Sequence, residues 1–212
     1  MKKAIIFDMD GTLLYTLDDL HEAVNAALRV YGYNSRSWNE IRDFVGNGVP
    51  KLIERALPNG RSSIHYEKVL AEFFIQYEKN VDKLTRPYEG IIPLLDKLKS
   101  KGVMLGVNSN KYDSAVSTLC SKYFPQIDCA LGAREGVEIK PSPFGALEVM
   151  KNLGVKPIEC LFVGDSDIDI KTAQNAGMVS VGVTWGYRSA ENLVNAGADY
   201  IINSPEALLE LV

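Results

Sequence analysis

Six short apolar runs, separated by segments with helical periodicity, constrain the fold of this 212-residue chain more than any other feature. The runs span residues 3–8, 103–108, 128–132, 160–165, 179–184 and 199–202. Several are apolar at nearly every position, which is typical of strands buried on both faces of a parallel sheet. Helical patterns lie between them at residues 91–101, 112–123, 142–153, 167–176, 189–196 and 205–212. This alternation predicts an α/β fold with a doubly wound parallel sheet.

Residues 15–86 interrupt this alternation because they contain no convincing strand. Apolar side chains recur there at helical spacing in three stretches, over residues 17–31, 49–57 and 66–77. Thr16 and Asp19 have the spacing of a capping box at the start of the first stretch. The sequence therefore predicts a Rossmann-like core domain formed by residues 1–14 and 87–212, with residues 15–86 inserted as a separate helical domain.

The bulk composition argues against several classes of partner. The formal net charge is −4 and charged residues make up 24% of the chain, so nothing favours nucleic acid or an anionic membrane surface. No apolar run approaches the roughly 18 residues that a spanning helix needs. An acid follows the two N-terminal lysines too soon for a secretory signal. We expect a cytoplasmic protein, a monomer or homodimer, that binds neither nucleic acid nor membrane.

Polar residues stand where four of the expected strands end. They are Asp8 with Asp10, Ser109 with Asn110, Lys140 after the third strand, and Asp165 with Asp169. In an open α/β sheet, ligands bind beyond the carboxyl ends of the strands. These side chains are therefore expected to meet at one site. We assign no chemistry to residues 186–212, which are expected to complete the sheet.

These residue types suit the transfer of a phosphoryl group. A carboxylate that attacks a phosphate dianion meets repulsion, about 4 kcal/mol for two unit charges 4 Å apart at an effective dielectric of about 20. Mg²⁺ between the carboxylates and a phosphate oxygen would reverse that sign. Lys140 would neutralise a second oxygen, and Ser109 with nearby backbone N–H groups would bind the others. One acid would attack phosphorus while another manages protons, but spacing alone does not assign the two roles.

The sequences FDMDGT and GDSDID, together with Ser109 and Lys140, resemble the four motifs of the haloacid dehalogenase superfamily in its phosphatase branch. The segment 15–86 resembles that family's type-1 helical cap. The resemblance implies a Mg²⁺-dependent hydrolase of small phosphate esters with a defined set of roles. By this resemblance, Asp8 is the nucleophile and Asp10 is the general acid/base. The metal ligands are Asp8, Asp165 and the backbone carbonyl of Asp10, and Asp169 is a supporting acid. The residues that bind the phosphoryl group are Ser109, Asn110 and Lys140.

The glycine-rich turn GNG within the insertion is the candidate determinant of specificity. Gly46 and Gly48 permit positive φ or close backbone approach, and Asn47 offers donors and an acceptor. We expect Asn47 and Gly48 to contact the leaving group of the substrate. This turn and the later PYEG are most similar to those of phosphoglycolate phosphatases. The chain departs from them at Tyr15, where these proteins commonly carry aspartate.

Three other functions remain open on sequence alone. A sugar phosphomutase similar to β-phosphoglucomutase would share the motifs and the cap, and a pyrophosphatase or nucleotidase would share the chemistry. A non-catalytic phosphate-binding regulator on the same scaffold is disfavoured because Asp8 and Asp10 are both present. The leading prediction is a phosphomonoesterase that acts through an aspartyl-phosphate on a small, phosphoglycolate-like metabolite.

Overall fold

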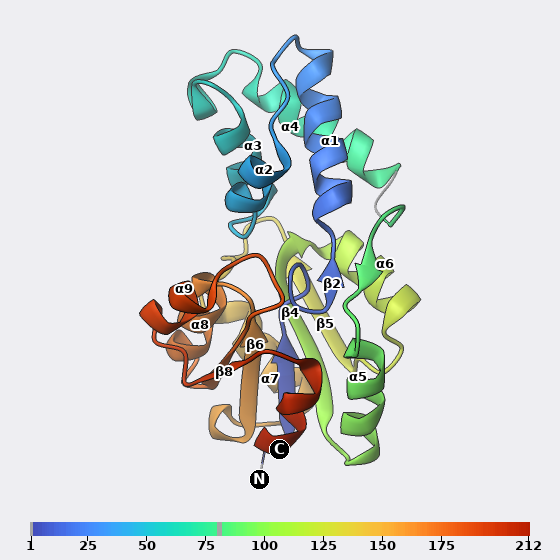
Figure 1. Cartoon of the computed structure of the whole chain (residues 1–212), viewed down its shortest axis with the longest axis vertical. Coiled ribbons are helices and arrows are strands. Elements are labelled where there is room, and N and C mark those ends of the chain that lie inside the picture. Colours follow the sequence, from blue (N-terminus) through green and yellow to red (C-terminus); the bar gives the residue numbers. More distant parts are fainter. Residues whose placement is uncertain (1, 80–81) are drawn as a thin grey trace. The chain divides into compact units, whose positions relative to one another are not determined.

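The computed structural model describes residues 2–79 and 82–212. The chain divides into two compact units (Figure 1). Met1–Leu14 and Pro87–Val212 form the first, here named the core unit, and Tyr15–Arg86 form the second, the helical unit. Within the described ranges, none of the helices has both the length and the apolar character that crossing a membrane requires.

The core unit is built on a six-stranded parallel sheet (Figure 1). Its strands are β1 (Ala4–Phe7), β4 (Met104–Tyr112), β5 (Cys129–Ala133), β6 (Cys160–Gly164), β7 (Val179–Val183) and β8 (Tyr200–Ile202). Their order across the sheet is β5-β4-β1-β6-β7-β8. Counted along the chain this is 3-2-1-4-5-6, the Rossmann order. The predicted fold class, a doubly wound parallel sheet with a helical insertion after the first strand, is confirmed.

Helices pack against the strands because the strands are apolar on both faces. All four residues of β1 are buried. The helices of this unit are α5 (Ile91–Ser100), α6 (Asp113–Tyr123), α7 (Phe144–Leu153), α8 (Asp167–Asn175) and α9 (Ala190–Asn195). On one face, Ile6 and Phe162 share a buried cluster with Val149 of α7 and Ala173 of α8. Short 3₁₀ helices, η2 (Pro157–Glu159) and η3 (Pro205–Leu211), complete the unit; the last segment was predicted as an α-helix.

The end of β4 departs from the prediction, which ended this strand at residue 108. Asn108 pairs with Leu131 and Tyr112 with Ala133, so four steps along β4 match two along β5. Such a bulge redirects side chains and is frequent next to active sites. The polar residues between these two pairs are consequently buried at the carboxyl end of the sheet instead of following it in a loop.

The helical unit is an all-helical bundle. Its elements are α1 (Leu17–Val30), α2 (Trp38–Phe44), α3 (Val49–Ala56), η1 (Gly60–Ser62) and α4 (Tyr66–Glu78). Its interior includes Val24, Leu28, Ile41 and Phe73, all fully buried. The sequence analysis missed α2, a seven-residue helix with one buried position, Ile41.

Two short strands mark the passage of the chain between the units. β2 (Leu14–Tyr15) and β3 (Arg86–Pro87) pair with each other in a two-stranded sheet. Neither was predicted, because two residues are too few to show a period. Within the core unit, the Tyr88 N–H donates to the Leu13 carbonyl over 3.1 Å, which joins the chain segments on either side of the insertion.

The predicted capping box at Thr16 and Asp19 is wrong. The Thr16 side chain makes no capping hydrogen bond to α1. The buried Asp19 carboxylate accepts instead from the Leu84 and Thr85 backbone N–H groups and from the Thr85 hydroxyl, at 2.7–3.1 Å. These long-range donors satisfy the carboxylate more fully than one N-cap N–H would. A capping box is present instead at Ser37, where α2 begins.

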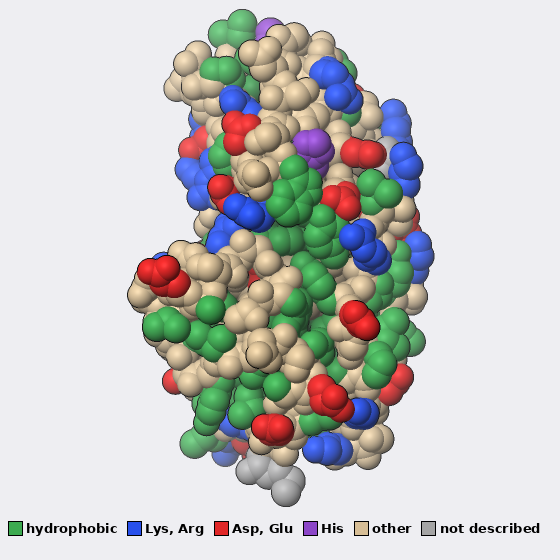
Figure 2. Space-filling view, viewed as in Figure 1, with side chains coloured by type: hydrophobic (Ala, Val, Ile, Leu, Met, Phe, Trp, Pro, Cys, Tyr) green, Lys and Arg blue, Asp and Glu red, His purple; other side chains and the backbone are tan. Residues whose placement is uncertain are grey.

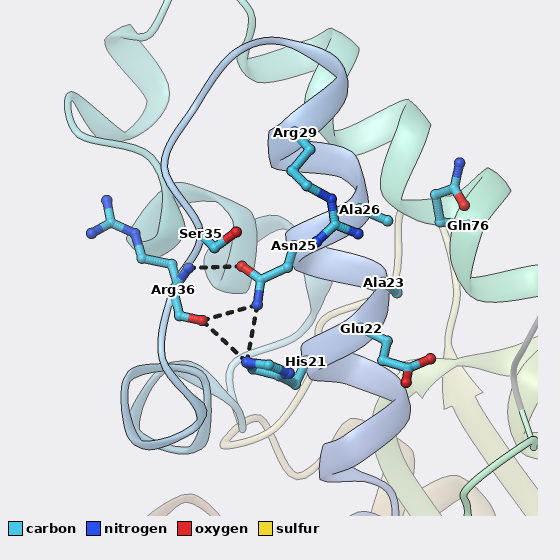
Figure 3. Close-up of a pocket in the computed structure, with 9 residues that line it drawn as sticks. All are labelled: His21, Glu22, Ala23, Asn25, Ala26, Arg29, Ser35, Arg36 and Gln76. Carbon is cyan, nitrogen blue, oxygen red and sulfur yellow. Dashed lines mark hydrogen bonds between the residues drawn. The ribbon is translucent and has the colours of Figure 1, made fainter.

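A polar hollow of about 440 Å³ lies in the helical unit (Figure 3). Asn25 of α1 closes part of it: its Oδ1 accepts from the Arg36 N–H at 2.7 Å, and its Nδ2 donates to the Arg36 carbonyl at 2.9 Å. His21 lies 3.1 Å from the same carbonyl. These bonds fasten the segment before α2 to α1.

On the face shown in Figure 2, acidic and basic side chains are interspersed, in keeping with the small net charge.

Candidate active site

Three buried carboxylates meet at the carboxyl end of the central strands. Asp8 directly follows β1, Asp165 directly follows β6, and Asp169 lies in the first turn of α8. Their ligand oxygens lie within 4.8 Å of one another. The exposed fractions are 9%, 2% and 1%, so water screens the three charges little. The neighbouring positions of β1 and β6 in the sheet bring these distant parts of the sequence together.

Lys140 is the cation of this cluster. Its Nζ lies 2.8 Å from Asp8 Oδ1 and 2.6 Å from Asp169 Oδ1, and its side chain is 3% exposed. Asn110 fixes the Lys140 backbone: the Lys140 N–H donates to Asn110 Oδ1 at 2.8 Å, and Asn110 Nδ2 donates to the Lys140 carbonyl at 3.1 Å. These two bonds hold the Asn110 side chain against the Lys140 backbone.

Ser109 lies in the bulged end of β4, beside Asn110, and is 3% exposed. Its Oγ accepts from the Lys111 N–H at 3.3 Å. Because the oxygen acts here as an acceptor, the hydroxyl hydrogen can still be donated to an anion.

Asp169 caps α8 as well as pairing with Lys140. Its Oδ2 accepts from the Ser166 hydroxyl at 2.6 Å and from the Ser166 N–H at 3.1 Å. The same motif contains Asp167, which pairs instead with Lys171 at 2.8 Å and has a side chain 44% exposed. The motif GDSDID therefore sends Asp165 and Asp169 into the cluster and Asp167 outward.

Asp165 is held by a loop to which the sequence analysis assigned no chemistry. The Tyr187 N–H donates to Asp165 Oδ2 at 2.7 Å. A Cβ added to Gly186 would lie 2.2 Å from the Asp165 Cβ, and one added to Gly11 would lie 2.4 Å from Asp165 Oδ2. Gly11 also has a φ of +86°. Both positions therefore require glycine to leave room for the carboxylate. No signal in the sequence ties Gly186 to Asp165.

Burial and mutual repulsion perturb the acids. Burial raises the pKa of Asp8 to about 7, against the lowering effect of Lys140 and with a further rise from Asp169. Burial, followed by the charges of Asp169 and Asp8, also raises the pKa of Asp165 well above its ordinary value. Burial alone would lower the pKa of Lys140, but Asp169 and Asp8 outweigh it and hold that pKa above its ordinary value.

The cluster fits a divalent cation. It contains three buried carboxylates, and Lys140 is paired with two of them. Burial is the main cause that raises the pKa of Asp8 and of Asp165, so a cation bound between them would favour their charged forms. Carboxylate oxygens are the ligands that Mg²⁺ prefers. The two glycines around Asp165 leave space that any larger side chain would fill.

Asp10 lies outside this cluster. Lys111 Nζ is 2.9 Å from Asp10 Oδ1 and 3.1 Å from Oδ2, with side chains 3% and 15% exposed. The sequence analysis assigned no role to Lys111. Two lysines thus pair with three of the acids of the site: Lys140 contacts Asp8 and Asp169, and Lys111 contacts Asp10.

The predicted specificity residues Asn47 and Gly48 lie in the helical unit, in the turn between α2 and α3. Gly46 and Gly48 have φ values of +121° and +79°, so this turn depends on glycine. Asn47 is half-buried. Arg55 donates to the Phe44 carbonyl at 2.7 Å, which ties the end of α2 to α3.

The comparison with protein families agrees with this geometry. Residues 5–183 match the family of haloacid dehalogenase-like hydrolases. The chain belongs to this family, and it is an enzyme of the phosphatase type found among its relatives.

Relatives at the level of single proteins are similar over nearly their whole lengths. The phosphoglycolate phosphatase of Vibrio parahaemolyticus is 35% identical, with 99% of this chain and 96% of that protein covered. The N-acetylmuramic acid 6-phosphate phosphatase of Pseudomonas aeruginosa is 30% identical, with coverage of 99% and 94%. A crystal structure from Lactobacillus delbrueckii subsp. bulgaricus has a TM-score of 0.93 at 36% identity, with coverage of 100% and 98%.

Proposed function

We propose that the protein hydrolyses small phosphate monoesters through an aspartyl-phosphate formed on Asp8. The observation that carries the proposal is the buried cluster of Asp8, Asp165 and Asp169 around Lys140, at the carboxyl end of a Rossmann-ordered sheet. Lys140 stays charged because its pKa is raised, so it neutralises an oxygen of the phosphoryl group. Ser109 donates its hydroxyl hydrogen to another oxygen.

In the first half-reaction, a carboxylate oxygen of Asp8 attacks phosphorus. A bond forms between that oxygen and phosphorus, and the bond to the ester oxygen breaks. Asp10 gives its proton to the departing ester oxygen, which leaves as an alcohol.

In the second half-reaction, water attacks the phosphorus of the aspartyl-phosphate. Asp10 takes the proton of the attacking water, and the bond between phosphorus and Asp8 breaks. Asp8 is restored as a carboxylate and Asp10 is protonated again, so the enzyme is ready for the next ester. One acid therefore serves both half-reactions.

Asp8, Asp165 and the backbone carbonyl of Asp10 would hold Mg²⁺, with Asp169 supporting them directly or through water. When bound, Mg²⁺ would polarise the phosphoryl group and lessen its repulsion of the carboxylates. The hydrogen bond from the Tyr187 N–H and the close approach of Gly11 and Gly186 hold the Asp165 carboxylate in place. Such outer contacts orient a metal ligand, and their loss typically lowers metal affinity by about 10- to 100-fold.

For the substrate we propose a small, phosphoglycolate-like metabolite. The full-length similarity to phosphoglycolate phosphatases supports it. We further propose that the helical unit acts as a cap and that Asn47 and Gly48 contact the leaving group. An Asn47→Ala enzyme should then change its KM and its ranking of esters; unchanged kinetics across all esters would contradict this role.

A sugar phosphate is the second candidate substrate. The Pseudomonas aeruginosa relative named for N-acetylmuramic acid 6-phosphate favours it, since its identity to this chain is within a few per cent of that of the phosphoglycolate phosphatases. The chemistry at Asp8 and Asp10 would be the same for both esters.

The deciding experiment measures phosphate release by the purified protein with Mg²⁺ and with chelator. The panel contains 2-phosphoglycolate, N-acetylmuramic acid 6-phosphate, hexose phosphates, pyrophosphate and nucleotides. Asp8→Asn tests the nucleophile, and Asp167→Asn is the matched control from the exposed position of the GDSDID motif. Metal-dependent release that disappears in Asp8→Asn alone supports the proposal. Isomerisation of a sugar phosphate without net release would replace it with a mutase.

A further inference from the structure

A second ion pair, between the buried Lys111 and the partly buried Asp10, lies at the site and is separate from the carboxylate cluster. Lys111 places its ammonium group within 3.1 Å of both oxygens of Asp10. The Lys111 side chain is 3% exposed, which is rare for a lysine unless it is paired. An exposed ion pair would carry little information, but a buried one requires specific geometry to offset its desolvation.

The backbone around Lys111 is fixed by its neighbours. Lys111 lies in the irregular part of β4, between the pairs that Asn108 and Tyr112 form with β5. A Cβ added to Gly132 of β5 would lie 2.6 Å from the Lys111 carbonyl oxygen, so β5 contacts this segment closely. The Gly132 N–H donates to Asp113 Oδ1 at 2.7 Å, directly beyond the bulge. The Lys111 side chain therefore starts from a rigid position.

We propose that Lys111 is a positioning residue, which holds the Asp10 carboxyl group for its two proton transfers. The inference rests on the proposed function of Asp10 as general acid and base. Contact with both oxygens restricts rotation of the carboxyl group, and proton transfer depends on its direction toward the ester oxygen and then the water.

Two esters separate this role from general damage to the site. An alkyl ester such as 2-phosphoglycolate needs a proton on its departing oxygen, whereas 4-nitrophenyl phosphate releases a stable phenolate that does not. For Lys111→Met we expect kcat/KM to fall roughly 10- to 100-fold with the alkyl ester, within the 10²- to 10⁴-fold range of general acid catalysis. With the nitrophenyl ester we expect a change of less than about fivefold.

A double-mutant cycle tests whether Lys111 acts through Asp10. In an Asp10→Asn background, Lys111→Met should cost less than about threefold with the alkyl ester, because the group that it positions is gone. Lys111→Arg keeps the charge and should recover at least part of the loss. Lys99→Met is the matched control, since Lys99 pairs with Asp128 on the half-exposed surface of the same unit. If Lys111→Met does not fold, Lys111→Gln replaces it in the cycle.

Three results would overturn the inference. They are equal losses with both esters, independent losses in the double-mutant cycle, and a raised KM with unchanged kcat, which would make Lys111 a substrate anchor. Failure of the proposed function itself would look different, because the unmodified protein would then release no phosphate from either ester.

Discussion

The core unit and the helical unit bury different types of side chain. At the carboxyl end of its sheet, the core unit buries five charged side chains: Asp8, Lys111, Lys140, Asp165 and Asp169. In the helical unit the described buried side chains are mostly apolar, and two of the polar ones, Asp19 and Asn25, bind backbone groups. Burying charge costs stability unless the charges are paired, and burying apolar surface supplies it. The comparison indicates a core unit shaped by its reaction and a helical unit shaped by packing.

The largest effect should come from the nucleophile. Asp8→Asn should lower phosphate release by roughly 10⁴-fold or more, as loss of a covalent nucleophile does. The same substitution should not lower the Tm of the metal-free protein at pH 8, because it removes one charge from a repelling cluster. Activity within about tenfold of the unmodified protein would contradict the role of Asp8 as nucleophile, and with it the view that the buried charges of the core unit serve the reaction.

In the helical unit, Phe73→Ala should lower stability and leave magnesium binding unchanged, the opposite of what is expected for Asp8→Asn. Phe73 is fully buried and stacks on Tyr77 with ring centroids 5.4 Å apart. Its truncation should lower the free energy of unfolding by about 3–5 kcal/mol. Denaturant titration gives this value, and magnesium titration should find an unchanged affinity. A stability loss below about 1 kcal/mol would show that this unit is not held by its apolar interior.

Magnesium should stabilise the protein in a pH-dependent way. The folded metal-free protein binds more protons than the unfolded chain between about pH 4 and 7, because the pKa of Asp8 is raised to about 7. Its free energy of unfolding should therefore fall as the pH rises through that range. Bound metal requires the carboxylates, so added Mg²⁺ should stabilise more at pH 8 than at pH 5.5. At pH 8 a hundredfold excess over Kd should add about 2.7 kcal/mol to the free energy of unfolding. Equal shifts of Tm at both pH values would contradict this.

Gly186→Ala should weaken magnesium binding by roughly 10- to 100-fold, the usual cost of losing a group that orients a metal ligand. The added methyl group would displace Asp165. Calorimetric titration with Mg²⁺ measures the change. Gly154→Ala is a control in which the added Cβ meets no neighbouring atom, so magnesium affinity should not change. Its φ of +67° adds backbone strain that Gly186 does not have, so the two variants are compared by magnesium affinity and not by stability.

The smallest effect is expected at Asp167. Since its partner Lys171 is also half-exposed, Asp167→Asn should change stability by no more than about 0.5 kcal/mol and activity by no more than about twofold. A loss comparable to that of Asp165→Asn, measured in the same phosphate-release assay, would move Asp167 into the site.

The sequence was sufficient to predict the site residues whose positions depend on where the strands end. Acids after buried strands are costly without a reason, and the parallel order of the strands brings Asp8, Asp165 and Lys140 together. It did not predict what depends on side chains from separate strands facing one another. In the sequence nothing distinguishes Lys111 from the other lysines; its contact with Asp10 depends on the bulge in β4.

Local rules also failed where long-range partners competed. Thr16 and Asp19 have the spacing of a capping box, but the donors at Leu84 and Thr85 take the carboxylate, and no local pattern reveals them. Conversely, Ser37 and Glu40 have the same spacing and do form the box. That pair was the available signal for the missed helix α2.

The hydrogen bond between Leu13 and Tyr88 has a consequence for engineering and for evolution. It places the two ends of the interrupted core sequence side by side, so the core could be closed by a tight turn in place of residues 15–86. The entropy of closing a loop grows slowly with its length, and an insertion between such ends costs the core little. The helical unit can therefore be lengthened, redesigned or replaced by another insertion, while the sheet of the core unit and its carboxylates keep their fold.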